Sequence, residues 1–342
     1  MYLVTGGSGY FGEVLVHKLL QSGASVRVFD LRPPSFSHQN LDYFQGDIRQ
    51  LSQIKEALKG IRIVHHNVAQ VPLAKNAGLF WAVNHGGTLH LLKASLLAGV
   101  QKVVYTSSSA IYGVPTILPV SENTLPHPAE AYGKAKYAGE LLCKDYIDQG
   151  LDISIIRPRT ILGHGRLGIF QILFEWIYQN HNIPVLGQGD NVYQFVHAED
   201  LADACIAAGH SKGPDSFNIG TDQYGTLYDA IQHLIIHAKS RSKIRRFPFT
   251  LATLGMKISS ALRLSPLGPY HALMYGRSMY FDLTQAKEKL GFQPRYSNDA
   301  MFQESYDWYI QHRDALLTQK KQRSTHQSPV KEGILYCLKK II

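Results

Sequence analysis

The stretch MYLVTGGSGYFG, residues 1–12, decides the fold of this chain. A short apolar strand runs from Tyr2 to Val4, and three glycines follow it at intervals of three: Gly6, Gly9 and Gly12. Such a turn lets the backbone bend tightly, lets it approach a pyrophosphate, and lets the next helix pack closely on the strand. The amphipathic helix that follows would point its amino-terminal N–H groups at that phosphate.

A carboxylate follows the next predicted strand. Residues 25–29 are apolar and β-branched enough to form that strand, and Asp30 stands at its end. In the dinucleotide fingerprint an acidic residue at this place binds the ribose diol. Asp47 stands at the end of a third strand, from where it could reach the adenine edge. The context favours a dinucleotide site over a glycine turn without a ligand.

Strand and helix patterns alternate through the first half of the chain. Strands are predicted at 2–4, 25–29, 62–66, 102–106 and 152–157, and helices at 11–22, 51–59, 80–98 and 130–149. This alternation predicts an α/β fold, a Rossmann-type doubly wound parallel sheet whose ligands bind beyond the carboxyl ends of the strands.

The pattern changes after Gly163, where longer apolar helices and Pro/Gly turns begin. We expect a dinucleotide-binding domain at 1–162, completed by a helix at 196–208 and a strand at 216–219 within 196–220. A smaller, interleaved substrate domain is expected at 163–195 and 221–312, followed by a basic tail at 313–342.

Composition indicates a globular enzyme. The 342 residues are 45% hydrophobic and 18% charged, enough for a full core. The first residues already form a strand, and no apolar stretch of about 18 residues is present, so a cytoplasmic protein is expected. The three cysteines form no CxxC pair, and the side chains of His65 and His66 would point to opposite faces of a strand, so no metal site is expected.

The formal charge of +9 is concentrated in two places. Residues 231–280 carry eight basic and no acidic residues, and the tail from Arg313 carries seven basic and two acidic residues. No nucleic-acid-binding motif accompanies these charges. The sequence therefore predicts anionic small substrates or an anionic membrane surface as partners, and no nucleic acid.

Two motifs indicate proton transfer at an alcohol or carbonyl. Tyr132 and Lys136 lie four residues apart on a predicted helix, so they share a face, and the ammonium is expected to lower the pKa of the phenol. A tyrosine so poised can exchange a proton with an alcohol or carbonyl. The segment 105–113, YTSSSAIYG, follows the fourth predicted strand and offers a serine that can hydrogen-bond the reacting oxygen.

Together these motifs resemble the extended short-chain dehydrogenase/reductase superfamily, in its NAD-dependent epimerase/dehydratase group. The resemblance extends over residues 1 to about 312 and also includes HNVA at 66–69, Asn84, Arg157-Pro158 and LGFQP at 290–294. It implies a catalytic triad of Ser108, Tyr132 and Lys136, with Ser107 and Ser109 as alternatives to Ser108.

The resemblance also implies the cofactor site. The residues that it assigns to the cofactor are Gly6, Gly9, Tyr10, Phe11, Gly12, Asp30, Asp47, Ile48, Ala69, Tyr132 and Lys136. Asp30 favours NAD over NADP, because a carboxylate binds the free ribose diol and repels a 2′-phosphate. Arg32 works against that preference.

Two substrate classes stay open. Sugar-nucleotide epimerases of this group usually have an asparagine where this chain has Thr160, and an arginine where it has Tyr193, and both groups normally hold the diphosphate. The basic residues from 239 to 277 could replace them. The apolar segment 247–280 is similar to the corresponding region of 3β-hydroxysteroid dehydrogenases, although an ordinary pair of core helices would also explain it. A nucleotide sugar is the first prediction and a hydroxysteroid or lipid alcohol the alternative; a non-catalytic NAD-binding scaffold is disfavoured by the full triad.

Two further expectations concern assembly. The helices near 84–98 and 130–149 are expected to pair with their copies in a homodimer, as the resemblance implies. In the tail, apolar residues share one helical stripe beside two lysines: Ile334, Leu335, Leu338, Ile341 and Ile342, with Lys339 and Lys340. This stripe would either make a weak peripheral contact with an anionic membrane or dock on the protein itself or on a partner subunit.

Overall fold

The computed structural model describes residues 1–70, 77–261, 274, 276–318, 333, 335, 336 and 339. Its centre is a seven-stranded sheet with the strand order β11-β6-β5-β4-β1-β2-β3, and every neighbouring pair in it is parallel. The strands are β1 (Tyr2–Thr5), β2 (Val26–Asp30), β3 (Leu41–Gln45), β4 (Ile63–His66), β5 (Lys102–Thr106), β6 (Ile153–Pro158) and β11 (Asp215–Ile219). The order reverses between β1 and β4, which is the crevice where such sheets bind ligands. The predicted doubly wound fold is confirmed.

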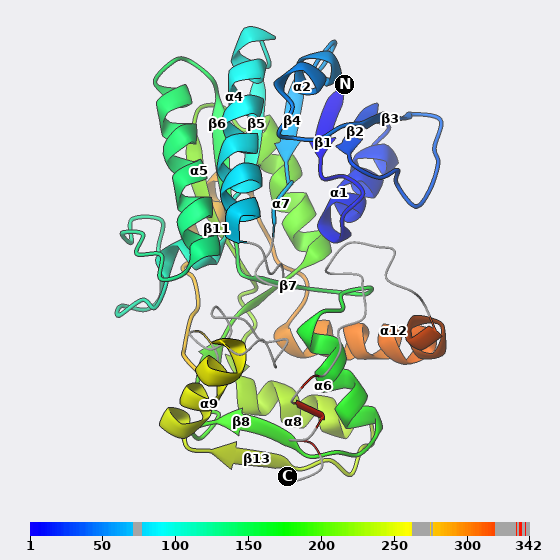
Figure 1. Ribbon diagram of the computed structural model, residues 1–342, viewed down its shortest axis with the longest axis vertical. Helices are drawn as coiled ribbons and strands as arrows, with labels where there is room; N and C mark the ends of the chain where they lie inside the picture. The colour runs from blue at the N-terminus through cyan, green and yellow to red at the C-terminus, as the bar shows by residue number, and fades with distance from the viewer. Residues whose placement is uncertain are drawn as a thin grey trace.

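Helices cover both faces of this sheet (Figure 1). One face carries α1 (Tyr10–Gln21), α7 (Ala198–His210) and α11 (Thr284–Leu290), and the other carries α2 (Leu51–Ala57), α4 (Thr88–Leu97) and α5 (Ala131–Ile147). Adjacent strand residues enter different cores: Leu3 packs with α2, α4 and α5, and Val4 packs with α1 and α7. Burial on both faces explains why these strands are nearly continuous apolar runs.

The predicted helix at 80–98 has two parts. After α3 (Ala77–Leu79), residues Phe80–Gly87 form the π-helical segment η1, and α4 follows directly. The Asn84 side chain accepts from the Gln70 amide at 2.7 Å and donates to the Gln70 carbonyl at 3.0 Å. This pair of hydrogen bonds ties η1 to the segment after β4, at the carboxyl end of the sheet.

The remaining elements form a layer below the carboxyl ends of the strands in Figure 1. Its helices are α6 (Ile169–Tyr178), α8 (Leu227–His237), α9 (Phe249–Ala261) and α12 (Asn298–Thr318). Three short strand pairs join them: β7 (Thr160–Leu162) with β10 (Phe195–His197), β8 (Ile183–Leu186) with β13 (Ile244–Phe247), and β9 (Val192–Tyr193) with β12 (Gly225–Thr226). Residues 196 and 197 were predicted as the start of a helix. They instead pair with β7. The helix α7 begins only after them, because His197 caps it by accepting from the Glu199 amide.

The described part of the tail lies against this lower layer. Leu335 packs on the core that α6, α8 and α12 share, and Lys339 donates to the Gln179 side chain at 3.3 Å. Docking on the chain itself is thus observed for these two residues. The other members of the predicted stripe, Ile334, Leu338, Lys340, Ile341 and Ile342, lie outside the described residues. Within the described ranges, no helix has both the length and the hydropathy needed to cross a bilayer.

Candidate active site

A cavity of about 1050 Å³ lies at the carboxyl ends of the strands and continues into the lower layer. Every residue predicted for the cofactor or for catalysis contributes to its wall: Gly6, Gly9, Tyr10, Phe11, Gly12, Asp30, Asp47, Ile48, Ala69, Ser108, Tyr132 and Lys136. The fold explains why these residues meet, since they lie at or just after the carboxyl ends of strands or in the first two turns of α1 and α5.

The glycine turn requires glycine at two positions, Gly6 and Gly12. Gly6 has a φ of +70°, in the left-handed region. A Cβ on Gly12 would lie 2.0 Å from the carbonyl oxygen of Gly6, so α1 can pack this closely only without one. Gly9 donates its N–H to the Gly6 oxygen at 3.1 Å and precedes the first residue of α1. The turn has the form that a pyrophosphate requires.

Asp30 is held at the rim of the cavity by backbone donors. Its two oxygens accept from the Ser8 amide at 3.2 Å and from the Arg32 amide at 3.3 Å. Burial raises the pKa of this carboxyl above its ordinary value, and the backbone hydrogen bonds oppose that rise. At the other rim Asp47 binds Arg49 through both oxygens, and this hydrogen bonding holds the pKa of Asp47 below its ordinary value.

Tyr132 enters the cavity from the first turn of α5. Glu130 caps that helix, accepting from the Tyr132 amide at 2.7 Å and the Gly133 amide at 2.6 Å. Burial raises the pKa of the Tyr132 phenol to about 12, while a hydrogen bond with Ser108 and the charge of Arg166 lower it. Ser108 is therefore the serine that reaches the tyrosine.

The two neighbouring serines have other surroundings. Ser107 donates to Glu140 of α5 at 2.5 Å, and Glu140 is in turn paired with Arg157 of β6 at 2.8 Å, between the sheet and the helix. Ser109 is buried in the short helix η2 (Ser109–Tyr112). All three serines line the cavity, and Ser108 is the one whose hydrogen bond lowers the pKa of Tyr132.

Lys136 differs from expectation in its partner. Its Nζ donates to the Thr106 carbonyl at 2.6 Å and lies 4.4 Å from the centre of the Tyr105 ring. Burial lowers the pKa of this ammonium to about 8. The expectation that Lys136 lowers the pKa of Tyr132 stays a prediction, since the Lys136 side chain turns toward β5 here; the cation whose charge lowers this pKa in the structure is Arg166.

Arg166 was missed by the sequence analysis. It follows β7, lines the cavity, and places its guanidinium carbon 5.7 Å from the centre of the Tyr10 ring. Burial lowers the pKa of Arg166 to about 10, and the neighbouring Tyr10 and Tyr132 act in the opposite direction. The segment GHGR at 163–166 matches no spacing rule, so only the fold could bring this arginine to Tyr132.

The far half of the cavity is mainly apolar. It is lined by Ile169, Phe170, Ile172, Leu173, Trp176, Ile183, Leu186, Phe195, Leu227, Ile231, Phe247, Met256, Met274, Phe302 and Leu335. At its edge the hydroxyls of Thr160 and Tyr193 hydrogen-bond each other at 2.9 Å. These are the two positions where a sugar-nucleotide epimerase is expected to hold the diphosphate, and here they form a neutral pair.

The basic segment does not supply replacement ligands within the described residues. From 239 to 277 the cavity wall takes only Phe247, Ala252, Gly255, Met256, Met274 and Gly276. Residues 262–273 and 275, part of the predicted apolar segment, lie outside the described ranges.

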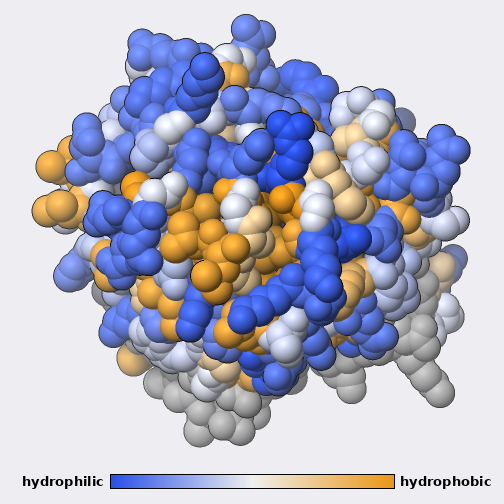
Figure 2. Space-filling model, turned by 90° about the horizontal axis from the view of Figure 1, so that it is seen from above, coloured by the Kyte–Doolittle hydropathy of each residue, from blue (hydrophilic) through white to orange (hydrophobic). Residues whose placement is uncertain are grey.

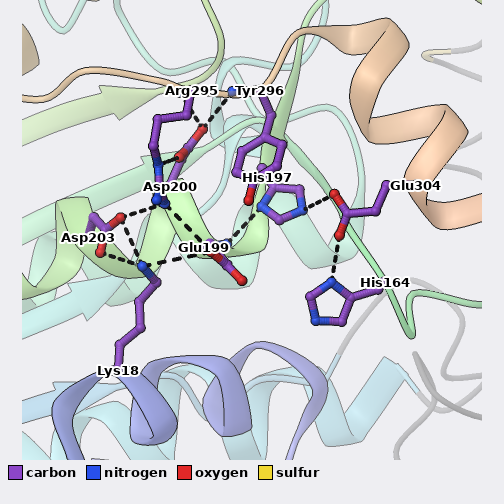
Figure 3. A network of polar contacts seen from close by, with 9 residues as sticks. All are labelled: Lys18, His164, His197, Glu199, Asp200, Asp203, Arg295, Tyr296 and Glu304. Atoms are coloured by element: carbon purple, nitrogen blue, oxygen red, sulfur yellow. Dashed lines mark hydrogen bonds and ion pairs between the residues drawn. The ribbon is translucent and has the colours of Figure 1, made fainter. Parts of the chain in front are cut away.

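A polar network beside the cavity joins three elements (Figure 3). Glu304 of α12 binds His164 at 2.6 Å and lies 3.3 Å from Nε2 of His197. Nδ1 of His197 accepts from the Glu199 amide, so Nε2 carries the hydrogen and offers no lone pair. The cluster of His164, His197 and Glu304, which the sequence did not reveal, is therefore better described as a hydrogen-bond network than as a metal site.

The geometry agrees with a comparison of sequences. A profile of the NAD dependent epimerase/dehydratase family matches residues 2–220. The chain belongs to this family. Its matched region holds the glycine turn, Asp30 and the three residues of the expected triad.

Three relatives illustrate the range of similar proteins: one is uncharacterized, one is a sterol dehydrogenase and one is a UDP-glucose epimerase. The chain is 53% identical over 337 residues to the uncharacterized protein y4nG of Sinorhizobium fredii, covering 98% of this chain and 85% of that protein. It is 27% identical to human sterol-4-alpha-carboxylate 3-dehydrogenase, decarboxylating, over 86% of this chain and 84% of the relative. It is 32% identical to UDP-glucose 4-epimerase of Mycolicibacterium smegmatis, over 64% of this chain and 76% of the relative.

A solved family structure superimposes closely. MoeE5, in complex with UDP-glucuronic acid and NAD, gives a TM-score of 0.76 at 25% identity, covering 91% of this chain and 99% of that one. This structural neighbour binds NAD, and the chain is an NAD-dependent enzyme of the extended short-chain dehydrogenase/reductase type.

Proposed function

We propose that this protein oxidises a secondary alcohol of an apolar, steroid-like substrate with NAD, or reduces the corresponding ketone. The observation that carries the proposal is the wall of the substrate half of the cavity, which is aliphatic and aromatic from α6 to α9. Such a wall stabilises a hydrocarbon skeleton by about 25 cal/mol per Å² of buried apolar surface and gives little to a sugar.

Each polar residue has a role in this reaction. Tyr132 exchanges the proton with the reacting oxygen, and Ser108, which already contacts the phenol, orients that oxygen. Arg166 stabilises the phenolate form of Tyr132. Lys136 and Asp30 are assigned to the ribose hydroxyls of NAD, which supplies the hydride acceptor when bound. NAD is favoured over NADP because Asp30 is fixed at the rim by two amides.

Similarity over length supports the same choice. The sterol dehydrogenase matches 86% of this chain, including part of the substrate layer, whereas the UDP-glucose epimerase matches 64%. The neutral pair of Thr160 and Tyr193 also removes the two groups expected to hold a diphosphate. A second candidate, epimerisation or dehydration of a nucleotide sugar, is kept because the higher identity, 32%, is to that epimerase.

The test is to incubate the purified protein with NAD and each of two substrates, a 3β-hydroxysteroid and UDP-glucose, and to follow NADH fluorescence and product by mass spectrometry. We expect NADH to accumulate with the steroid alcohol, and Tyr132→Phe to abolish the signal. Conversion of UDP-glucose to an epimer without net NADH would reject the proposal in favour of the second candidate.

A further inference from the structure

A buried arginine in the cavity wall has no acidic partner among the residues that the structure describes. Arg159 lies between β6 and β7, is 1% exposed, and its Nε donates to the Gln194 carbonyl at 3.2 Å. Its guanidinium carbon lies 4.7 Å from the centre of the Tyr193 ring and 5.5 Å from that of Phe281. Nη1 and Nη2 are buried and have no hydrogen-bond partner among the described residues.

A second buried arginine, two residues earlier in the chain, has the hydrogen-bond partners that Arg159 lacks. Arg157 is also buried, but its Nε and Nη2 bind the two oxygens of Glu140 at 3.0 and 2.8 Å, and its Nη1 binds the Tyr112 hydroxyl at 2.8 Å. A buried guanidinium without such partners carries a large desolvation cost. Arg159 is therefore unlike an ordinary core ion pair.

A second side chain in the cavity wall, Asn191, also has a donor without a hydrogen-bond partner among the described residues. Asn191 is 6% exposed, and its Nδ2 is buried with no hydrogen-bond partner in the described structure. It stands two residues before Tyr193, whose ring centre lies 4.7 Å from the guanidinium carbon of Arg159, and all three residues line the cavity. The acidic residues in the described wall are Asp30 and Asp47, and both lie at the cofactor end.

We propose that Arg159 and Asn191 form an anion subsite in the apolar half of the cavity and bind a carboxylate of the substrate. Nη1 and Nη2 of Arg159 and Nδ2 of Asn191 are donors without a hydrogen-bond partner among the described residues, which suits an acceptor with two oxygens, and a planar guanidinium binds a carboxylate through two parallel hydrogen bonds. The substrate class becomes an apolar alcohol that also carries a carboxylate. This inference rests on the proposed function for the apolar part of the substrate, but not for the anion.

The test compares a steroid alcohol that also carries a carboxylate with the methyl ester of the same compound. Binding to the NAD-loaded protein is measured by calorimetry, so no turnover is needed. We expect the acid to bind about 10- to 100-fold more tightly than the ester, the ratio for one charge-assisted pair of hydrogen bonds. Arg159→Met should abolish this preference, Arg159→Lys should retain part of it, and the exposed Arg246→Met should leave it unchanged.

Thermal unfolding checks that the variants are folded and separates a structural role from a binding one. Without ligand, Arg159→Met should unfold at the wild-type temperature or above it, because it removes an unpaired buried charge. Equal binding of acid and ester by the wild type, or an unchanged preference in Arg159→Met, overturns the subsite. Loss of UDP binding in Arg159→Met, with the acid unaffected, assigns the subsite to a phosphate and overturns the carboxylate.

Bromide distinguishes failure of this inference from failure of the proposed function. In a crystal of the NAD-loaded protein soaked in sodium bromide, we expect anomalous diffraction to place an ion against Arg159 and Asn191. A bromide ion there, with no binding of either steroid, keeps the anion subsite and rejects the apolar substrate. Bromide at surface sites and none at Arg159 rejects the subsite itself.

Discussion

At the scale of single residues, spacing predicted which side chains reach the cavity but not whom they contact. Tyr132 and Lys136 share a face of α5, as four-residue spacing requires. Nevertheless Lys136 binds the Thr106 carbonyl, and Arg166, from a segment without a motif, influences the phenol. Long side chains choose among the partners that the fold offers, and those partners come from other strands.

The role of Tyr132 is tested by Tyr132→Phe, which removes one hydroxyl from a buried ring. Folding and NAD binding should be retained, because the helix cap at Glu130 uses backbone amides. Turnover should fall by about 10²- to 10⁴-fold, the usual loss for a general acid or base. Steady-state kinetics and calorimetry measure the two effects. Near-normal turnover in this variant would end the assignment.

The role of Asp30 in cofactor choice is tested by Asp30→Ala. The carboxylate is an acceptor for the ribose diol, so its loss should weaken NAD binding about 10- to 100-fold and improve the NADP to NAD ratio. Calorimetry with each cofactor measures this, and Asp42→Ala, at an exposed pair with Arg27, is the control. Tighter binding of NADP than NAD by the wild type would show that Arg32 dominates.

The buried pair of Arg157 and Glu140 links β6 to α5 behind the triad. Arg157→Met leaves the Glu140 carboxylate, which is 0% exposed, without its partner. We expect a loss of about 3–5 kcal/mol in the free energy of unfolding, measured with denaturant. Lys59→Met, at the exposed pair with Glu56, should cost about 1 kcal/mol or less. Equal losses in the two variants would contradict the difference in burial.

At the scale of elements, the segment between β7 and α6 is fixed by contacts with distant parts of the chain. It carries Arg166 into the cavity, and His164 within it binds Glu304 of α12. Beside it, Lys18 of α1 and Arg295 bind Asp203 of α7, both at 2.8 Å (Figure 3). The site therefore depends on how α1, α7 and α12 pack around this segment.

The contact of His164 with Glu304 predicts a pH dependence of stability. The carboxylate raises the pKa of His164 above 6.5, so this contribution is complete below pH 6.5 and is lost as the pH rises through the raised value. The two histidines lower the pKa of Glu304 to about 2, so its contribution is complete above the ordinary value of 4.5 and is lost as the pH falls toward 2. The pair is most stabilising between these limits.

Thermal unfolding of wild type and His164→Ala measures this effect. The difference in unfolding temperature should be largest near pH 5.5 and smaller near pH 8.5. Glu304→Gln should remove the same pH-dependent part, because it removes the charge that stabilises the imidazolium. A difference that stays constant with pH, or grows above pH 7, would contradict the role of the pair.

At the scale of the whole molecule, the cavity is lined by residues of both layers. Leu335, near the end of the chain, and the glycine turn at its beginning both contribute to the wall. A membrane role for the remaining tail residues stays a prediction. On the end of the molecule where α4 and α5 finish, hydrophobic residues form an area bordered by hydrophilic ones (Figures 1 and 2).

We propose that the chain forms a homodimer through the exposed faces of η1, α4 and α5. Trp81, Leu97 and Leu141 lie on these elements and are 47%, 68% and 42% exposed. Light scattering at micromolar concentration should give twice the chain mass, because a two-fold helix bundle would bury these side chains. Leu141→Lys should yield monomers, while Leu254→Lys, on α9, should not. A stable monomer of the wild type would reject the proposal.

The sequence by itself determined the doubly wound sheet, the glycine turn and the residues that line the cofactor half of the cavity. These depend on local periodicity and on residues that follow strands, which short stretches encode. Only the tertiary structure decided that Ser108 and Arg166 lie near enough to Tyr132 to lower its pKa, that His164 meets Glu304, and that Nη1 and Nη2 of Arg159 have no hydrogen-bond partner among the described residues. Those facts join residues up to 140 positions apart. They depend on side-chain packing between elements, which no local pattern specifies.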